Sequence, residues 1–224
     1  MNISDIENFN YLLIALKWFS IYFVISIGID VIQQLFGVGL GNPLTTNPIE
    51  SFFYLTVAPL NEEVIFRIFF LGIPMFVTFS FYRISFIHTI LRPSKTIPFS
   101  SRFKKTIMLI IILNSVFFGL SHVILGGGYE IGKITQASFG GLVLGWLYYR
   151  HGLATSILFH WISNYVLFSY GILSFLLFDF SWNDESNNYL LMFISSAFII
   201  LGCILLYRYG IRVIYNYKKM VKKV

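Results

Sequence analysis

Apolar residues fill long stretches of the chain, and polar residues gather in the shorter segments between them. Several of these stretches approach the roughly 20 residues that a helix needs to cross a bilayer. Six can be drawn, covering residues 10–30, 51–82, 107–126, 135–149, 153–178 and 189–207. Alternation with a period of two, typical of outer-membrane β-strands, is absent, and runs such as IMLIIIL favour helices. The pattern predicts an all-α, polytopic transmembrane bundle of about six spans in a single domain, residues 1–224.

The second stretch, 51–82, is longer than a bilayer needs, and it contains Pro59 and Pro74. Proline breaks or kinks a helix interior but is tolerated in a first turn. We therefore expect 51–58 to be a separate segment that leads into a helix beginning near Pro59. Elsewhere, we expect Gly140, Gly141 and Gly145 to allow close helix packing.

Composition supports the membrane interpretation. The 224 residues are 57% hydrophobic and 12% charged, against about 25% charged for an ordinary soluble domain. The N-terminus carries Asp5 and Glu7 and lacks a basic region and a cleavage pattern, so we expect the first stretch to be a retained span. The single Cys203 excludes an internal disulfide.

Basic residues predict the orientation in the membrane. They fill the segment after the second stretch (Arg83, Arg92, Lys95, Arg102, Lys104 and Lys105) and the tail from Arg208 to Lys223. Positive residues favour the cytoplasmic side, so both termini are expected there. Acidic residues then fall at outward-facing connections: Asp30, Glu50, Glu130, Asp179, Asp184 and Glu185. Topology and contact with anionic lipid account for the net charge of +6, without a nucleic-acid partner.

Three charged residues interrupt the second apolar stretch: Glu62, Glu63 and Arg67. Each charge near the middle of a span costs roughly 2.5–3.5 kcal/mol on insertion scales. Glu63 and Arg67 stand four residues apart and can pair on one helix face, so they could simply lock helices together. Glu62 lies about 100° away around the helix, so it needs a partner from another span.

Candidate partners occur in two further spans. His122 ends the run FFGLSH, and His160 and Asn164 lie in LFHWISN, four residues apart on one helix face. Together these side chains predict a polar cluster in an intramembrane cavity between helices. Counted along straight spans, however, His122 falls in the outer half, Asn164 near the middle and His160 nearer the cytoplasm. Tilted or broken helices would be needed to bring them to one depth.

The same residues resemble the motifs of a known family. EEVIFR matches the signature EExxxR, FGLSH (Phe118 to His122) matches FxxxH, and HWISN matches HxxxN of the CAAX prenyl endopeptidase and bacteriocin-processing (CPBP) intramembrane proteases, also called the Abi family. The three motifs stand in the family's order on apolar stretches. The resemblance covers a catalytic core of about residues 50–170.

The resemblance implies hydrolysis of a peptide bond inside the membrane, with Glu62 as the general base toward water and His122 helping to hold or polarise that water. His160 and Asn164 would donate to the developing oxyanion. Glu63 and Arg67 would form the orienting pair, although either acid could be the base.

Metal dependence stays open at the level of sequence. The family has been described as metal-dependent, and Glu62, His122 and His160 supply the ligand types of a His₂Glu zinc site. No HExxH motif is present. We favour a metal-free glutamate mechanism, with zinc as the alternative.

The substrate class follows only from the resemblance. Eukaryotic relatives trim prenylated CAAX proteins, and prokaryotic relatives process peptides and bacteriocins or confer immunity against them. A small chain without extra domains favours the prokaryotic group and a prokaryotic cell membrane. The expected partners are a peptide or membrane-anchored protein substrate and the lipid bilayer. The alternative of another class is a non-catalytic membrane binding or immunity protein, or a small carrier, whose buried charges only pair or relay ions.

Overall fold

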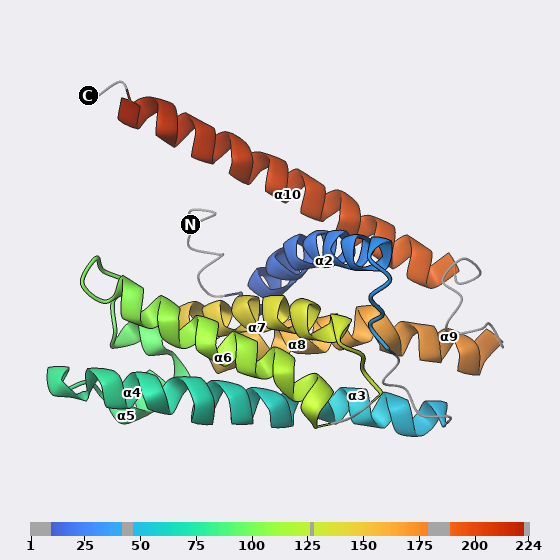
Figure 1. The fold of residues 1–224 in the computed structure, drawn as a ribbon, viewed down its shortest axis with the longest axis horizontal. Helices are drawn as coiled ribbons and strands as arrows, with labels where there is room; N and C mark the ends of the chain where they lie inside the picture. The colour runs from blue at the N-terminus through green and yellow to red at the C-terminus, as the bar shows by residue number, and fades with distance from the viewer. Residues whose placement is uncertain (1–9, 42–46, 126–127, 179–188, 222–224) are drawn as a thin grey trace.

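The computed structural model describes residues 10–41, 47–125, 128–178 and 189–221 (Figure 1). Its α-helices are α2 (Tyr11–Leu35), α3 (Pro48–Glu63), α4 (Ile73–Phe79), α5 (Phe86–Leu91), α6 (Lys104–Ile124), α7 (Gly132–His151), α8 (Leu153–Asn164), α9 (Tyr170–Phe178) and α10 (Tyr189–Val221). Two π-helices, η1 (Val64–Gly72) and η4 (Tyr165–Ser169), and two 3₁₀ turns, η2 (Ser80–Tyr82) and η3 (Pro93–Lys95), complete them. In the described ranges the only β-structure is an isolated bridge between Gly41 and Tyr129. The predicted all-α architecture is confirmed.

Five helical segments of the described chain are long and apolar enough to cross a membrane: Tyr11–Leu35, Pro48–Tyr82, Lys104–Ile124, Leu153–Phe178 and Tyr189–Lys219. Each coincides with one of the six predicted stretches. The remaining stretch, 135–149, lies in α7, a helix of 20 residues that is less apolar than these five. Most of α7 is buried against α6, α8 and α2. It therefore has less need of apolar side chains that face lipid.

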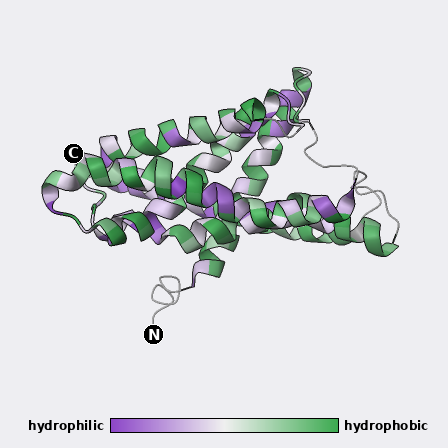
Figure 2. Ribbon diagram, turned by 90° about the horizontal axis from the view of Figure 1, so that it is seen from below, coloured by the Kyte–Doolittle hydropathy of each residue, from purple (hydrophilic) through white to green (hydrophobic). Residues whose placement is uncertain are grey.

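Large apolar side chains cover the outside of the bundle. Phe81 is 93% exposed, Phe193 74% and Leu113 61%, and many other apolar side chains are similarly uncovered. Figure 2 shows hydrophobic residues along the length of the long helices, interrupted by hydrophilic turns. A soluble protein rarely exposes so much contiguous apolar surface, whereas lipid covers it favourably. The chain is an integral membrane protein.

The second predicted stretch differs from expectation at its start. Helix α3 begins at Pro48, capped by the side chain of Asn47, and continues through Pro59 to Glu63. The expectation of a separate segment 51–58 with a helix start near Pro59 was therefore wrong. Pro59 is instead an interior residue of α3, and helices from elsewhere in the bundle compensate for it, as described below. Pro74 does stand in the first turn of a helix, α4.

Small residues bring α6 and α7 into close contact. A Cβ added at Gly119 of α6 would collide with the Ser138 side chain and with backbone of α7. A Cβ at Gly141 would lie 3.1 Å from Phe118, and one at Gly145 would lie 3.1 Å from Ile111. The predicted role of Gly141 and Gly145 in close helix packing is confirmed, whereas Gly140 has ordinary contacts, with Tyr22 at 3.4 Å or more. This packing fixes the position of α6, which carries one of the predicted site histidines.

The basic segment between α4 and α6 covers the end of α7. The hydroxyls of Tyr148 and Tyr149 donate to the carbonyls of Ile90 and Ile97 at 2.5 and 2.7 Å. Arg92 and Ser94 both donate to the carbonyl of Arg150. These contacts tie the basic segment to the short turn between α7 and α8.

Charges are divided between the two ends of the bundle. Lys17 of α2, Arg92 and Arg150 lie close enough to His151 to act on it electrostatically, and Arg208 and Arg212 of α10 share a groove with Lys17. The other end carries Asp30, Glu50 and Glu130, beside the contact between Gln33 and the carbonyl of Gly132. Among the residues on which the predicted orientation rested, Asp5, Glu7, Asp179, Asp184, Glu185, Lys222 and Lys223 lie outside the described residues.

Candidate active site

The two acidic residues of the first motif stand where α3 changes into the π-helix η1. Glu62 and Glu63 are the last residues of α3, and Arg67 lies in the first half of η1. π-Helices are rare and occur mostly as short insertions, frequently at functional sites. The wider turn changes the direction in which the following side chains leave the helix. The motif therefore combines two adjacent carboxylates with an unusual backbone.

Glu63 and Arg67 form a fully buried ion pair, with side chains 0% exposed and 2.8 Å between Arg67 Nε and Glu63 Oε2. Arg67 Nη1 also donates to Asn114 Oδ1 at 2.6 Å. The amide nitrogen of Asn114 in turn donates to the carbonyl of Phe66 at 3.0 Å. Asn114 therefore ties α6 to both the guanidinium and the π-helical backbone, as a buried charge requires.

Glu63 accepts two further hydrogen bonds from α8. The Ser156 hydroxyl donates to Glu63 Oε2, and His160 Nδ1 lies 3.0 Å from Glu63 Oε1. Because a carboxylate paired with arginine can only accept, His160 Nδ1 must carry the hydrogen. In the neutral ring, Nε2 is then left with a lone pair. Glu63 therefore fixes both the orientation and the tautomer of His160.

His122 is oriented in the same way by its own helix. Its Nδ1 lies 2.8 Å from the carbonyl oxygen of Phe118, one turn earlier in α6. A carbonyl oxygen can only accept, so Nδ1 donates and Nε2 again carries the lone pair of the neutral ring. Two histidines from two helices thus present the same kind of atom.

Both of these Nε2 atoms face Glu62. Its Oε2 lies 3.8 Å from His160 Nε2 and 4.0 Å from His122 Nε2. Within the described residues, Oε2 is a buried atom with no hydrogen-bond partner. The side chain of Glu62 is nevertheless 28% exposed, whereas Glu63 is 0% exposed. Three acceptor atoms therefore converge on one point at the accessible edge of the cluster.

The spacing of these atoms suits a water molecule. A water molecule that donates hydrogen bonds of about 2.8 Å to two acceptors 3.8–4.0 Å apart would have an angle of about 90° between these bonds. This angle is near that between the two O–H bonds of water. A water between Glu62 and a histidine would satisfy the buried Oε2. It would also lie against a carboxylate that can take its proton.

Phe118, the first residue of the second motif, packs under the whole cluster. Its ring lies 5.0 Å from the Arg67 guanidinium carbon, and the rings of His122 and His160 lie 4.7 and 6.0 Å away. Phe118 is only 3% exposed. The aromatic residue of this motif therefore positions both histidines and screens the ion pair.

Asn164 occupies a different place from the other motif residues. Its Nδ2 donates to the carbonyl of Leu55 at 3.1 Å. That carbonyl would normally accept from the backbone N–H four residues later, which Pro59 lacks. One turn earlier in α8, Trp161 Nε1 donates to the carbonyl of Thr56 at 2.7 Å. Asn164 and Trp161 thus supply the bonds that allow proline in the interior of α3.

Two residues of the cluster, Ser156 and Asn114, were not identified from the sequence, although their spacing from the motif residues could have indicated both. Ser156 stands four residues before His160 and eight before Asn164, on the same face of the helix. Asn114 stands eight residues before His122, in an otherwise apolar run. A third residue, Lys133, is buried in α7 and lies over the ring of Tyr129, which contacts the His122 ring. No motif spacing links Lys133 to the cluster.

The structure brings together three residues that the sequence placed at different depths. Counting from the cytoplasmic end placed His160 and His122 far apart along their spans. In the structure Glu62 of α3 lies within 4.0 Å of both His122 of α6 and His160 of α8, and Asn164 lies one turn further along α8.

Glu62, His122 and His160 resemble the ligands of a zinc site in residue type but not in spacing. Two imidazoles held at Nδ1 and one carboxylate are ligands that zinc accepts, and hydrogen bonds at the far nitrogen are typical of zinc-bound histidines. Ligands about 2.0–2.1 Å from a tetrahedral ion lie about 3.3 Å apart, closer than the 3.8 and 4.0 Å found here. Among the described residues, no three His, Cys, Asp or Glu side chains form a ready metal site. The residue types therefore suit zinc, whereas the distances from Glu62 Oε2 to the two histidine Nε2 atoms suit a bound water molecule.

The amino-acid sequence of the chain matches a known family. Residues 44–166, more than half of the chain, match the family described as type II CAAX prenyl endopeptidase Rce1-like. The matched range contains all seven defined residues of the three motifs. No curated protein and no solved structure matched the chain. The family is one of membrane proteases, and the resemblance seen in the motifs is confirmed. The chain belongs to the type II CAAX prenyl endopeptidase Rce1-like family.

Proposed function

We propose that the protein is an intramembrane endopeptidase that hydrolyses a peptide bond of a membrane-associated peptide or protein. The observation that carries the proposal is the unpartnered Oε2 of Glu62, which faces the Nε2 atoms of His122 and His160 at 4.0 and 3.8 Å. Membership of a membrane protease family gives this arrangement its chemical context.

In the proposed mechanism, a water molecule binds between Glu62 and the histidines. Glu62 Oε2 takes a proton from the water as its oxygen attacks the carbonyl carbon of the scissile peptide bond. Glu62 then delivers that proton to the nitrogen of the leaving amine as the tetrahedral intermediate collapses. The result is one new carboxyl group and one new amine, with the protons balanced.

The oxyanion needs hydrogen-bond donors. His160 donates its Nδ1–H to Glu63, so the Nε2 of the neutral ring has no hydrogen to donate to the oxyanion and instead faces the water. Asn164 uses one amide N–H for the carbonyl of Leu55 and retains a second. We propose that the second N–H of Asn164 stabilises the oxyanion, without the donation from His160 that the motif resemblance implied.

Glu63 and Arg67 act as positioning residues in this mechanism. Their ion pair is 0% exposed and its carboxylate is already bound by Ser156 and His160. It has no free atom to activate water. The alternative version of the same protease uses zinc: Glu62, His122 and His160 would hold the ion, which would polarise the water and the substrate carbonyl when bound.

The substrate is proposed from the family and the position of the site. Glu62 lies in a helical segment long and apolar enough to cross a membrane, so the proposed substrate is lipid-anchored, apolar or itself membrane-inserted. A prokaryotic cell membrane with cytoplasmic termini is the proposed location, and no nucleic acid takes part.

The test is a peptidase assay on purified protein reconstituted in lipid vesicles, using a panel of membrane-associated peptides and mass spectrometry of the products. Wild type should release fragments that Glu62→Gln, His122→Ala and His160→Ala do not release, while all three variants remain folded. Identical fragments from wild type and from all three folded variants would contradict the proposal. They would favour the alternative of a non-catalytic binding or immunity protein.

A further inference from the structure

A second polar feature lies far from the protease site, between α2 and α10. The two helices are in close contact at Gly202 of α10, where an added Cβ would collide with the backbone of Ser20 of α2. On one side of this contact the ring of Phe198 packs 4.8 Å from that of Phe19. On the other side the two helices diverge, and α10 runs away from the bundle toward its C-terminal end (Figure 1). The separation leaves a groove of about 660 Å³.

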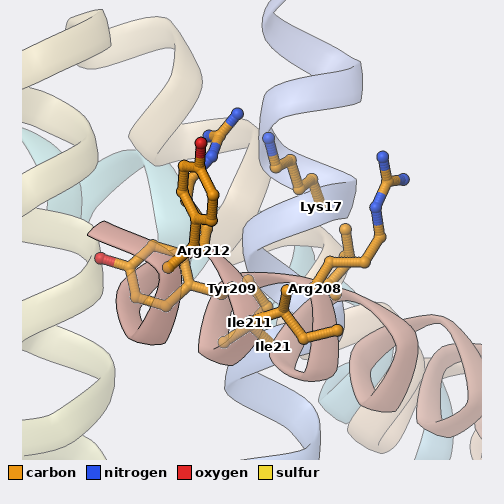
Figure 3. Close-up of a pocket in the computed structure, with 8 residues that line it drawn as sticks. Lys17, Ile21, Arg208, Tyr209, Ile211 and Arg212 are labelled. Carbon is orange, nitrogen blue, oxygen red and sulfur yellow. The ribbon is translucent and has the colours of Figure 1, made fainter. Parts of the chain in front are cut away.

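The groove is lined by cations above an apolar floor. Lys17 of α2 and Arg208 and Arg212 of α10 line it together with Ile21, Leu205 and Ile211. Figure 3 shows the charged ends of the three cationic side chains pointing to the same side, with Ile21 and Ile211 beneath them. Arg208 and Arg212 stand four residues apart on α10, so one ligand can reach both guanidinium groups.

The two arginines have no acidic partner in the part of the chain that the structure describes. Arg208 and Arg212 stand one turn apart on α10, so their like charges repel each other, and an anion between them relieves that repulsion. Arginine is well suited to phosphate, which it binds through two parallel hydrogen bonds. The charge of the groove therefore calls for an anionic ligand.

We propose that this groove binds the headgroup of an anionic phospholipid, with Arg208 and Arg212 on its phosphate and an acyl chain along Ile21 and Leu205. The apolar floor favours a lipid over a soluble phosphate, because a free anion would leave that floor in water. The position also fits, since the groove lies at the end of the bundle that carries the basic residues, and anionic lipid attracts such residues. Tyr209 and Tyr215 of the same groove suit the interface between headgroups and hydrocarbon.

The test compares lipid retention in four preparations. Wild type and Arg208→Gln/Arg212→Gln are purified in detergent, mixed with phosphatidylglycerol or phosphatidylcholine, and examined by native mass spectrometry. The matched control is Lys218→Gln/Lys219→Gln, which removes the same charge from the same helix outside the groove. The fourth preparation is wild type with inorganic phosphate in place of lipid.

We expect wild type and the Lys218/Lys219 variant to retain phosphatidylglycerol in preference to phosphatidylcholine, and the arginine variant to lose about tenfold or more of that retention. Equal losses in the two variants would overturn the proposal, because net charge alone would then explain binding. Competition by inorganic phosphate at low millimolar concentration would also overturn it, in favour of a soluble anion. Because all the altered residues are exposed on α10, the melting temperature of each variant without lipid serves as the check on folding.

Discussion

Two adjacent carboxylates in this protein have opposite environments. Glu63 accepts hydrogen bonds from Arg67, Ser156 and His160 and is completely buried. Glu62 is partly exposed, and its Oε2 has no partner among the described residues. The sequence placed the two acids about 100° apart on the helix, so different surroundings could be expected. The sequence could not show which of the two carboxylates would have its hydrogen bonds satisfied, because that depends on Ser156 and Asn114 from other helices.

The Glu63 and Arg67 pair yields the first prediction. Glu63→Gln or Arg67→Met alone leaves one uncompensated buried charge, which typically costs about 3–5 kcal/mol. The double variant removes both charges, and glutamine still offers an acceptor to Ser156 and His160. Monodisperse yield in detergent should therefore fall in each single variant and recover in the double variant. A double variant that is no better than the singles would mean that the ion pair is not what holds these helices together.

A second prediction at this scale concerns metal. If carboxylate-activated water is sufficient, a tight chelator should leave the peptidase rate unchanged, and purified active protein should contain no stoichiometric zinc. The measurement is metal content by elemental mass spectrometry beside the rate. Zinc at one equivalent, removed and restored together with activity, would instead assign Glu62, His122 and His160 as ligands.

At the scale of elements, the structure explains how a proline is accommodated inside α3. Pro59 deprives the carbonyl of Leu55 of its helical partner, and Asn164 supplies a replacement from α8. The motif residue Asn164 therefore has a structural bond in addition to its proposed role at the oxyanion. These two functions can be separated by experiment.

Asn164→Ala should destabilise the protein by about 1–3 kcal/mol, because it leaves a buried carbonyl unsatisfied. Adding Pro59→Ala restores a backbone N–H that can bond to Leu55, so the double variant should regain its melting temperature. Its peptidase rate should stay low, at about 10²–10³-fold below wild type, if the second amide N–H stabilises the oxyanion. Recovery of both rate and melting temperature would leave Asn164 with the structural role alone.

The secondary-structure elements also show which features could be predicted from the sequence and which could not. All six apolar stretches correspond to helices, since hydrophobic length is a strong signal. The π-helices η1 and η4 left no such signal, and the start of α3 at Pro48 was missed because Pro59 looked like a helix start. The meeting of His122, His160 and Glu62 was expected from the motifs. The way in which the helices bring them together was not, because it depends on how α3 packs against α8 and η1 against α6.

For the whole molecule, the division of charge between the two ends predicts its orientation. Cys203 is the only cysteine, so Cys203→Ser gives a cysteine-free background. In that background, Lys95→Cys and Lys219→Cys should react with an impermeant maleimide from the cytoplasmic side, because basic ends stay inside. Glu50→Cys and Glu130→Cys should react from the opposite side. Labelling of Lys95→Cys and Glu50→Cys from one side would contradict the arrangement of the spans.

The central claim is that Glu62 activates water for peptide hydrolysis, and the rate of Glu62→Gln per folded molecule tests it most directly. The matched control is Glu50→Gln, which makes the same change in the first turn of the same helix. Loss of a general base should lower the rate by about 10²–10⁴-fold. The melting temperature should remain that of wild type, because Glu62 Oε2 binds no other described residue. Glu50→Gln should keep the wild-type rate. If folded Glu62→Gln cleaves the substrate as fast as Glu50→Gln does, Glu62 is not the base.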